Sequence, residues 1–136
     1  DYAHKPDALK HALQALRPHT ACKLIVLFGC GGERDHEKRP EMGRLASELA
    51  DKVFITDDNP RGERPADIRR AINSGCSDAI VIGDREDAIA AAITMLAGGD
   101  VLLVAGKGHE VGQVIGDEVF PFDDSEVVRR LIRGGI

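Results

Sequence analysis

Three short polar segments carry the side chains that are best suited to binding a small charged ligand. They are the glycine-rich segment 29–35 with Arg34, the acidic segment 57–61 with Arg61, and the segment 106–110 with Glu110. Guanidinium groups match carboxylates in a bidentate geometry, and a glutamate carboxylate matches an ammonium group. Together these charges predict a zwitterionic, amino-acid-like ligand.

Neither glycine-rich segment fits a phosphate-binding pattern. Position 34 is Arg and position 111 is Val where the third glycine of G-x-G-x-x-G would stand, and no G-x-x-x-x-G-K-[ST] is present. One interpretation is that the glycines only turn the chain after a strand. The other is that they let backbone N–H groups approach a bound anion or carboxylate. The pattern alone leaves both open.

The charged residues also have simpler interpretations. Arg34 and Arg61 are compatible with solvated surface residues, or with ion pairs to acids such as Glu33 or Asp57. The segment 57–61 is compatible with a plain turn, because Asn-Pro favours turn initiation. Its carboxylates do not predict a magnesium site, since too few further oxygen ligands follow at fixed spacing.

The cysteines and histidines give no pattern of a metal or nucleophile site. Cys22, Cys30 and Cys76 are odd in number and lack C-x-x-C spacing, which disfavours a disulfide framework and structural zinc and indicates a reducing cytosol. For Cys30, small packing after a buried strand is favoured over a reactive thiol. The histidines have no helix-spaced partner, so we predict no metal ligand and no catalytic residue.

These segments are separated by alternating strand and helix patterns. Short continuous apolar runs predict strands buried on both faces, and apolar residues three or four apart predict helices. The predicted strands are 23–28, 52–56, 79–82 and 101–105, and the predicted helices are 7–16, 40–50, 65–73, 85–97 and one from 124 or 125 to 133. Residues 112–115 and 118–122 flank Gly116-Asp117 and predict an antiparallel hairpin.

This order predicts an α/β sandwich with a mostly parallel sheet and one antiparallel edge strand or hairpin near the C-terminus. Neither an internal repeat nor a linker is visible, so residues 1–136 are predicted to form a single domain. Each polar segment follows a predicted strand. Since ligands of parallel sheets bind beyond the carboxyl ends of the strands, the three segments are expected at one edge.

Composition excludes several classes of protein. The chain has 136 residues, of which 43% are hydrophobic and 30% charged, as in an ordinary soluble domain. A net charge of -5 argues against a general nucleic-acid binder. No apolar run approaches the roughly 20 residues needed to span a bilayer. The chain begins with Asp1 rather than Met, so we expect it to be a piece of a longer protein.

Residues 29–43, 57–61 and 106–110, together with residues 1–7 and 120–124, resemble the C-terminal domain of the Mur ligases, in the type that adds meso-diaminopimelate. The similarity runs through the whole chain in order. Mur ligases make peptidoglycan precursors in the bacterial cytoplasm. ATP phosphorylates a carboxylate of the substrate, UDP-N-acetylmuramoyl-L-Ala-D-Glu, and the amine of the incoming amino acid attacks the acyl phosphate. The resemblance implies a Rossmann-like three-layer sandwich that contacts the acceptor amino acid.

The resemblance also implies individual residue roles. The implied meso-diaminopimelate-binding residues are Arg34, Asp58, Asn59, Pro60, Arg61, Gly106 and Glu110. Arg34 would hold one carboxylate, Arg61 the distal carboxylate and Glu110 the distal ammonium. Lysine lacks the distal carboxylate, so a site built around Arg61 would reject it. His4 resembles a residue near the adenine, and Lys38 or Arg39 would face the nucleotide substrate.

The family's ATP loop, magnesium ligands, modified lysine and UDP-binding domain lie outside this sequence. ATP and Mg²⁺ would therefore bind mainly to a central domain, and the isolated chain is expected to be inactive. Its partners would be meso-diaminopimelate, ATP, the UDP-linked dipeptide and the central and N-terminal domains, without nucleic acid or membrane.

Two other functions stay open. The chain could be a stand-alone amino-acid- or nucleotide-binding module, such as a sensor, and a G-x-x-G-K-[ST]-type loop upstream in the same reading frame would favour the ligase. A folylpolyglutamate synthase domain is the nearest competitor by fold. Its acceptor is glutamate, and the segments 58–61 and 106–110 argue against it.

Overall fold

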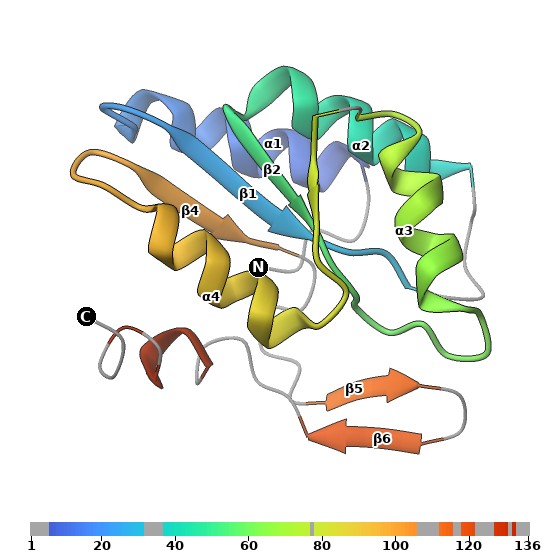
Figure 1. The fold of residues 1–136 in the computed structure, drawn as a ribbon. Helices are drawn as coiled ribbons and strands as arrows, with labels where there is room; N and C mark the ends of the chain where they lie inside the picture. Colours follow the sequence, from blue (N-terminus) through green and yellow to red (C-terminus); the bar gives the residue numbers. More distant parts are fainter. Residues whose placement is uncertain are drawn as a thin grey trace.

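A four-stranded parallel sheet forms the centre of the computed structural model (Figure 1). The structure describes residues 6–31, 37–76, 78–105, 112–115, 118–121, 127–130 and 132. The strands are β1 (Leu24–Phe28), β2 (Lys52–Ile55), β3 (Ile80–Val81) and β4 (Val101–Val104), in the order β3-β2-β1-β4. β1 pairs with β2 on one side and with β4 on the other, so β2 and β4 are not neighbours.

The central strand β1 is apolar at every position because helices cover both faces of the sheet. All five of its residues are fully buried. Leu24, Val26 and Phe28 belong to the core on one face, whereas Ile25 and Leu27 belong to the core on the other. This is the continuous apolar run expected of a parallel strand with two covered faces.

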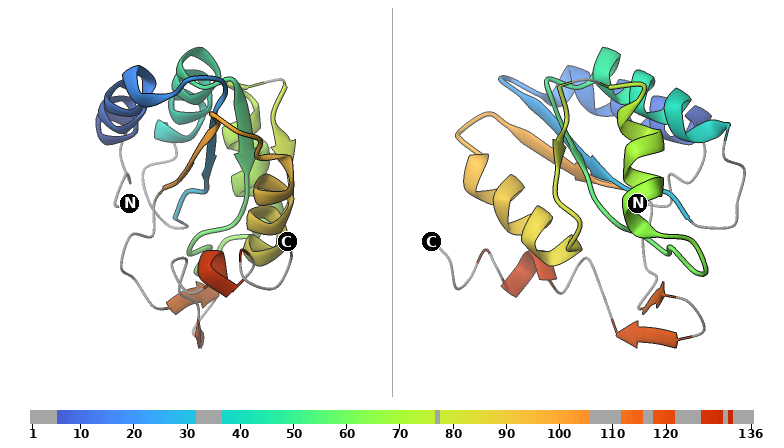
Figure 2. Two further views of the ribbon diagram at one scale, coloured as in Figure 1. Left: turned by 90° about the vertical axis from the view of Figure 1, so that its left-hand side faces the viewer. Right: turned by 45° about the vertical axis from the view of Figure 1, so that its right-hand side comes forward.

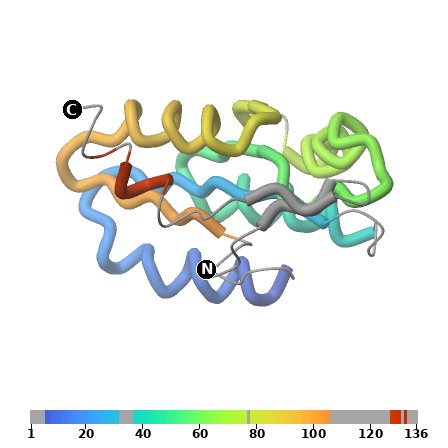
Figure 3. The backbone as a smooth tube through the Cα atoms, turned by 90° about the horizontal axis from the view of Figure 1, so that it is seen from below, coloured from blue at the N-terminus to red at the C-terminus, as the bar shows by residue number. Residues whose placement is uncertain are grey.

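In the described part of the chain, three helices cover the first face, and the helix 85–95 and the helical residues 127 and 128 lie on the second. α1 (Pro6–Leu16), α2 (Lys38–Leu49) and α3 (Pro65–Asn73) contribute Leu9, Leu13, Met42, Ala46, Ile68 and Ile72 to the first core. α4 (Arg85–Met95) contributes Ala88, Ile89 and Ala92 to the second. Figures 2 and 3 show α1 and α4 on opposite sides of the sheet. The predicted α/β sandwich is confirmed.

The predicted hairpin is also present. β5 (Gly112–Ile115) and β6 (Glu118–Pro121) pair antiparallel, with Val114 opposite Val119. In the described part of the chain they form a two-stranded sheet of their own rather than an added edge strand of the parallel sheet. Residues 127–130 and 132 are helical, within the last predicted helix, and Val127 packs into the second core.

Two helix boundaries differ from the predictions by two residues. α2 begins at Lys38, so the prediction that Pro40 opens the helix is wrong by two residues. Pro40 is tolerated inside the first turn because the N–H groups of the first turn have no hydrogen-bond partner within the helix. α4 ends at Met95, not Ala97, because the Ala97 N–H donates to the Asp100 carboxylate (3.0 Å). No helix in the described residues is long and apolar enough to cross a membrane.

Backbone contact between α2 and α3 depends on two glycines. A Cβ on Gly43 would overlap the carbonyl oxygen of Ile72, and a Cβ on Gly75 would overlap the carbonyl oxygen of Pro40. Backbone atoms cannot rotate away as a side chain can. The two glycines therefore set the position of α2, whose first turn carries Lys38 and Arg39.

We expect Gly43→Ala to lower the free energy of unfolding by about 1–3 kcal/mol, because the added methyl overpacks a backbone contact. Urea denaturation of the chain measures this. Gly98→Ala is the matched control, since a Cβ there meets nothing within 4 Å, and it should change stability by less than about 0.5 kcal/mol. Equal losses in the two variants would contradict the packing role of Gly43.

Candidate functional site

The carboxyl ends of β1, β2 and β4 lie at one edge of the sheet, where their arrowheads point in Figure 1. The structure describes residues 29–31, the whole segment 57–61 and Ala105 at this edge. Four of the predicted site residues, His4, Arg34, Gly106 and Glu110, lie outside the described residues, and their roles stay predictions. The described site is therefore built around the segment 57–61.

The first two segments touch through their backbones. A Cβ on Gly29 would overlap the carbonyl oxygen of Thr56 and would lie 3.0 Å from the backbone nitrogen of Asp58. At this position the missing side chain serves close backbone packing between the chain leaving β1 and the chain leaving β2. That packing places the segment 57–61 directly beside the end of the central strand.

The segment 57–61 is not a solvated turn. Asp58 and Asn59 are only 4% and 5% exposed, and Pro60 is buried as well. Arg61 has a φ of 52°, the left-handed conformation that residues other than glycine rarely adopt, and its Nη1 donates to the Asn59 carbonyl (3.4 Å). Strained backbone of this kind is concentrated at functional sites.

Asp57 anchors the start of this segment. Its carboxylate pairs with Arg69 of α3 (Nη1–Oδ1 2.5 Å), and its N–H donates to the Gly83 carbonyl after β3 (3.3 Å). The Thr56 hydroxyl donates to the same carbonyl (3.1 Å). Burial raises the pKa of the Asp57 carboxyl, and the hydrogen bond from Arg69 opposes that shift. Contacts from α3 and β3 thus fix the backbone just before Asp58.

Arg39 lies inside the protein rather than on its surface. Its side chain is buried, and its two Nη atoms donate to both carboxylate oxygens of Glu63 (2.9 and 3.0 Å). Nη2 also donates to the Gly31 carbonyl (3.0 Å), so Arg39 joins the chain after β1 to the chain after β2. A nucleotide contact by Arg39 would require this pair to open. The corresponding role of Lys38, which is half-buried, stays a prediction.

Sequence reasoning missed Arg85, the first residue of α4. It is 1% exposed and heads the set of large side chains that are fully buried. Nη1 donates to the Asp57 carbonyl (3.0 Å) and Nη2 to the Ala105 carbonyl (3.2 Å). The sequence signal that could have marked Arg85 was its place at the N-terminus of a predicted helix, where the macrodipole disfavours a cation. The preceding residue, Asp84, caps this helix by accepting the Asp87 N–H (2.9 Å).

Cys30 is part of the core packing, as predicted. Its Sγ lies 3.7 Å from the Met42 sulfur, and it packs against the first core. Burial raises the pKa of the Cys30 thiol to about 12, although Arg39 opposes the shift. The thiolate is the reactive form, so Cys30 is inert at neutral pH.

We expect a thiol reagent such as dithionitrobenzoate to modify exposed Cys22 at least about tenfold faster than Cys30 in the native chain at pH 8. Cys22→Ser should remove the fast phase of colour release, whereas Cys30→Ser should keep it. A fast phase that disappears with Cys30→Ser would contradict the inert state of Cys30.

We expect Glu63→Gln to destabilise the fold by about 1–3 kcal/mol, because it leaves the buried Arg39 charge without its carboxylate. Thermal or urea unfolding measures the loss. Glu48→Gln removes an exposed partner of Arg44 in α2 and should cost less than about 0.5 kcal/mol. If both variants cost the same, the Arg39–Glu63 pair contributes no more than a surface pair.

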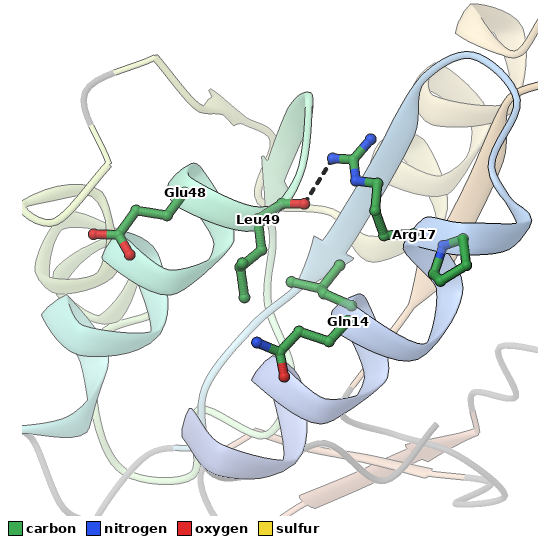
Figure 4. Close-up of a pocket in the computed structure, with 6 residues that line it drawn as sticks. Gln14, Arg17, Glu48 and Leu49 are labelled. Atoms are coloured by element: carbon green, nitrogen blue, oxygen red, sulfur yellow. Dashed lines mark hydrogen bonds between the residues drawn. The ribbon is translucent and has the colours of Figure 1, made fainter.

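A hollow lies between α1 and the C-terminal end of α2 (Figure 4). It has a volume of about 270 Å³ and is lined by Leu13, Gln14, Arg17, Pro18, Glu48 and Leu49. Arg17 donates to the Leu49 carbonyl (2.8 Å) and to Asp51 just before β2 (2.9 Å). This hollow is therefore at the amino end of the strands, away from the candidate site.

The described residues contain no cluster of three or more His, Cys, Asp or Glu side chains arranged to hold a metal ion.

A parallel sheet covered by helices on both faces places the chain in the class of doubly wound α/β domains, whose ligands bind beyond the carboxyl ends of the strands. The family model described as "Mur ligase, glutamate ligase domain" matches residues 1–108. The chain belongs to this family.

Individual relatives agree with this assignment. The UDP-N-acetylmuramoyl-L-alanyl-D-glutamate--2,6-diaminopimelate ligase of Chelativorans sp. strain BNC1 is 59% identical over 133 residues, which are 98% of this chain and 28% of that protein. A solved structure of a ligase with the same name is 40% identical, with a TM-score of 0.95 over 99% of this chain and 28% of that chain. The chain thus spans little more than a quarter of these ligases.

The fold extends to a more distant enzyme. A bifunctional folylpolyglutamate synthase/dihydrofolate synthase from Yersinia pestis, solved with AMPPNP and a manganese ion, is 22% identical. Its TM-score is 0.62, over 78% of this chain and 24% of that chain. At this identity the similarity concerns the fold alone.

Proposed function

We propose that this chain is the C-terminal, acceptor-binding domain of an ATP-dependent ligase that joins meso-diaminopimelate to UDP-N-acetylmuramoyl-L-alanyl-D-glutamate. The observation that carries the proposal is the 59% identity, across 98% of the chain, to a ligase named for that reaction. The whole of residues 1–136 forms the domain.

The segment 57–61 supports the acceptor role. The Asp58, Asn59 and Pro60 side chains are buried at the carboxyl edge of the sheet, and Arg61 is held in a strained backbone conformation beside them. Arg61 would bind the distal carboxylate of meso-diaminopimelate by a bidentate contact. Arg34 and Glu110 would bind the other carboxylate and the distal ammonium. The site would then select the acceptor by matching its charges.

The phosphorylation step belongs to the other domains. ATP and Mg²⁺ would bind mainly to a central domain, and the UDP-linked dipeptide to the central and N-terminal domains, within a cytoplasmic enzyme. Domain closure would then bring the amine of diaminopimelate to the acyl phosphate of the dipeptide, and phosphate would leave as the amide bond forms. On this proposal the isolated chain makes no tripeptide product, and a stand-alone sensor would be the alternative if no ligase surrounds it.

The test is an amide-resolved NMR titration of the chain with meso-diaminopimelate, with L-lysine and ATP in parallel. We expect shifts at Asp58, Asn59 and Arg61 that are larger with diaminopimelate than with lysine. Arg61→Gln should weaken diaminopimelate binding by about 10–100-fold, the usual value of a charge-assisted contact, and should change lysine binding much less. Arg70→Gln, an exposed arginine of α3, is the control.

Three outcomes would contradict the proposal. Equal responses to lysine and diaminopimelate would remove the role of Arg61. The ligase assignment would be wrong if the isolated chain showed no NMR shifts with diaminopimelate and the full-length protein that carries this segment also failed to turn diaminopimelate over. Tripeptide formation by the isolated chain would contradict the division of labour between domains.

A further inference from the structure

Arg85 connects two strand ends that the sheet itself does not connect. Asp57 follows β2 and Ala105 follows β4, and β1 lies between these strands in the sheet. Arg85 spans this gap from α4 with one guanidinium group, which donates 3.0 Å to the Asp57 carbonyl and 3.2 Å to the Ala105 carbonyl. The spacing of the two chain segments is therefore set by a rigid fork as well as by the strand ladders.

If Arg85 served only the stability of the fold, its position would be unfavourable in free energy. Its side chain is 1% exposed, so the charge loses its hydration, and it stands at the first residue of α4, where the helix dipole is positive. A buried apolar side chain of similar size would avoid both costs. The feature that an apolar side chain cannot reproduce is the link between two carbonyl oxygens on separate loops.

We propose that Arg85 is a positioning residue of the acceptor site, an inference that rests on the proposed function. Asp57 immediately precedes Asp58, Asn59, Pro60 and Arg61, and Ala105 immediately precedes the segment 106–110. Arg85 holds the Asp57 and Ala105 carbonyls, and its role is to position these backbone groups rather than to contact substrate. Arg85 acts through the residues that contact the acceptor. Its loss therefore weakens acceptor binding rather than slowing the chemical step.

The experiment measures steady-state kinetics of Arg85→Met in the full-length protein that carries this segment. We expect KM for meso-diaminopimelate to rise by about tenfold or more, because a displaced segment 57–61 would lose charge-assisted contacts to the acceptor. The kcat at saturating diaminopimelate, and the KM values for ATP and the UDP-linked dipeptide, should stay within about twofold, since uniform acceptor binding is what is lost. Arg85→Lys keeps the charge without the fork and should also raise KM.

Two control variants separate positioning from general destabilisation. Leu13→Ala empties a buried site in α1, at the opposite end of the sheet, and should lower Tm while leaving KM for diaminopimelate unchanged. Arg130→Met removes an exposed arginine that pairs with Glu86 and should change neither quantity. An unchanged KM in Arg85→Met, or a wild-type KM in Arg85→Lys, would overturn the positioning role.

An NMR comparison distinguishes this proposal from the proposed function. In the chain without ligand, Arg85→Met should shift the backbone amides of Asp58, Asn59 and Arg61, and unshifted amides would overturn the link itself. Failure of the wild-type full-length protein to use diaminopimelate would instead remove the proposed function, and with it the acceptor role of Arg85.

Discussion

The parallel alignment of β1, β2 and β4 is the constraint on which the rest of the structure depends, because it brings the chain segments that leave these strands to one edge and the segments that enter them to the other. At the amino edge the N–H groups of Lys23 and Leu24 need acceptors, and at the carboxyl edge the carbonyl groups of Gly31, Asp57 and Ala105 need donors. Each edge needs side chains of the complementary kind. The two edges of this sheet therefore have different chemistry.

Carboxylates serve the amino edge, and arginines serve the carboxyl edge. Asp51 accepts the Leu24 N–H (2.8 Å) and Asp100 accepts the Lys23 N–H (2.9 Å), and these backbone hydrogen bonds lower the pKa of both carboxyl groups. At the other edge, Arg39 donates to the Gly31 carbonyl and Arg85 to the Asp57 and Ala105 carbonyls. The buried cations that satisfy the carboxyl edge also connect its loops, so one set of contacts provides both stability and the arrangement of the candidate site.

Elements with a strong local pattern were predictable from the sequence, and contacts between distant segments were not. The run Leu24–Phe28 had to be a doubly buried strand, and the Pro65–Asn73 helix was predicted to the residue. The burial of Arg39 could not be predicted from the sequence, because its partner Glu63 is 24 residues away. Only the packing of α2 beside the chain that follows β2 brings the two side chains together. Arg85 escaped notice for the same reason.

The sequence by itself determined the α/β class, the order of the strands and helices along the chain, and the segment 57–61 as a binding candidate, because apolar periodicity and turn chemistry are local properties. Only the tertiary structure decided the strand order β3-β2-β1-β4 and the burial of Asp58 and Asn59. It also decided that Arg39 and Arg85 are buried. These features depend on which segments meet across the sheet. A lone arginine reads the same in sequence whether it faces water or two carbonyl oxygens, and packing alone distinguishes the two.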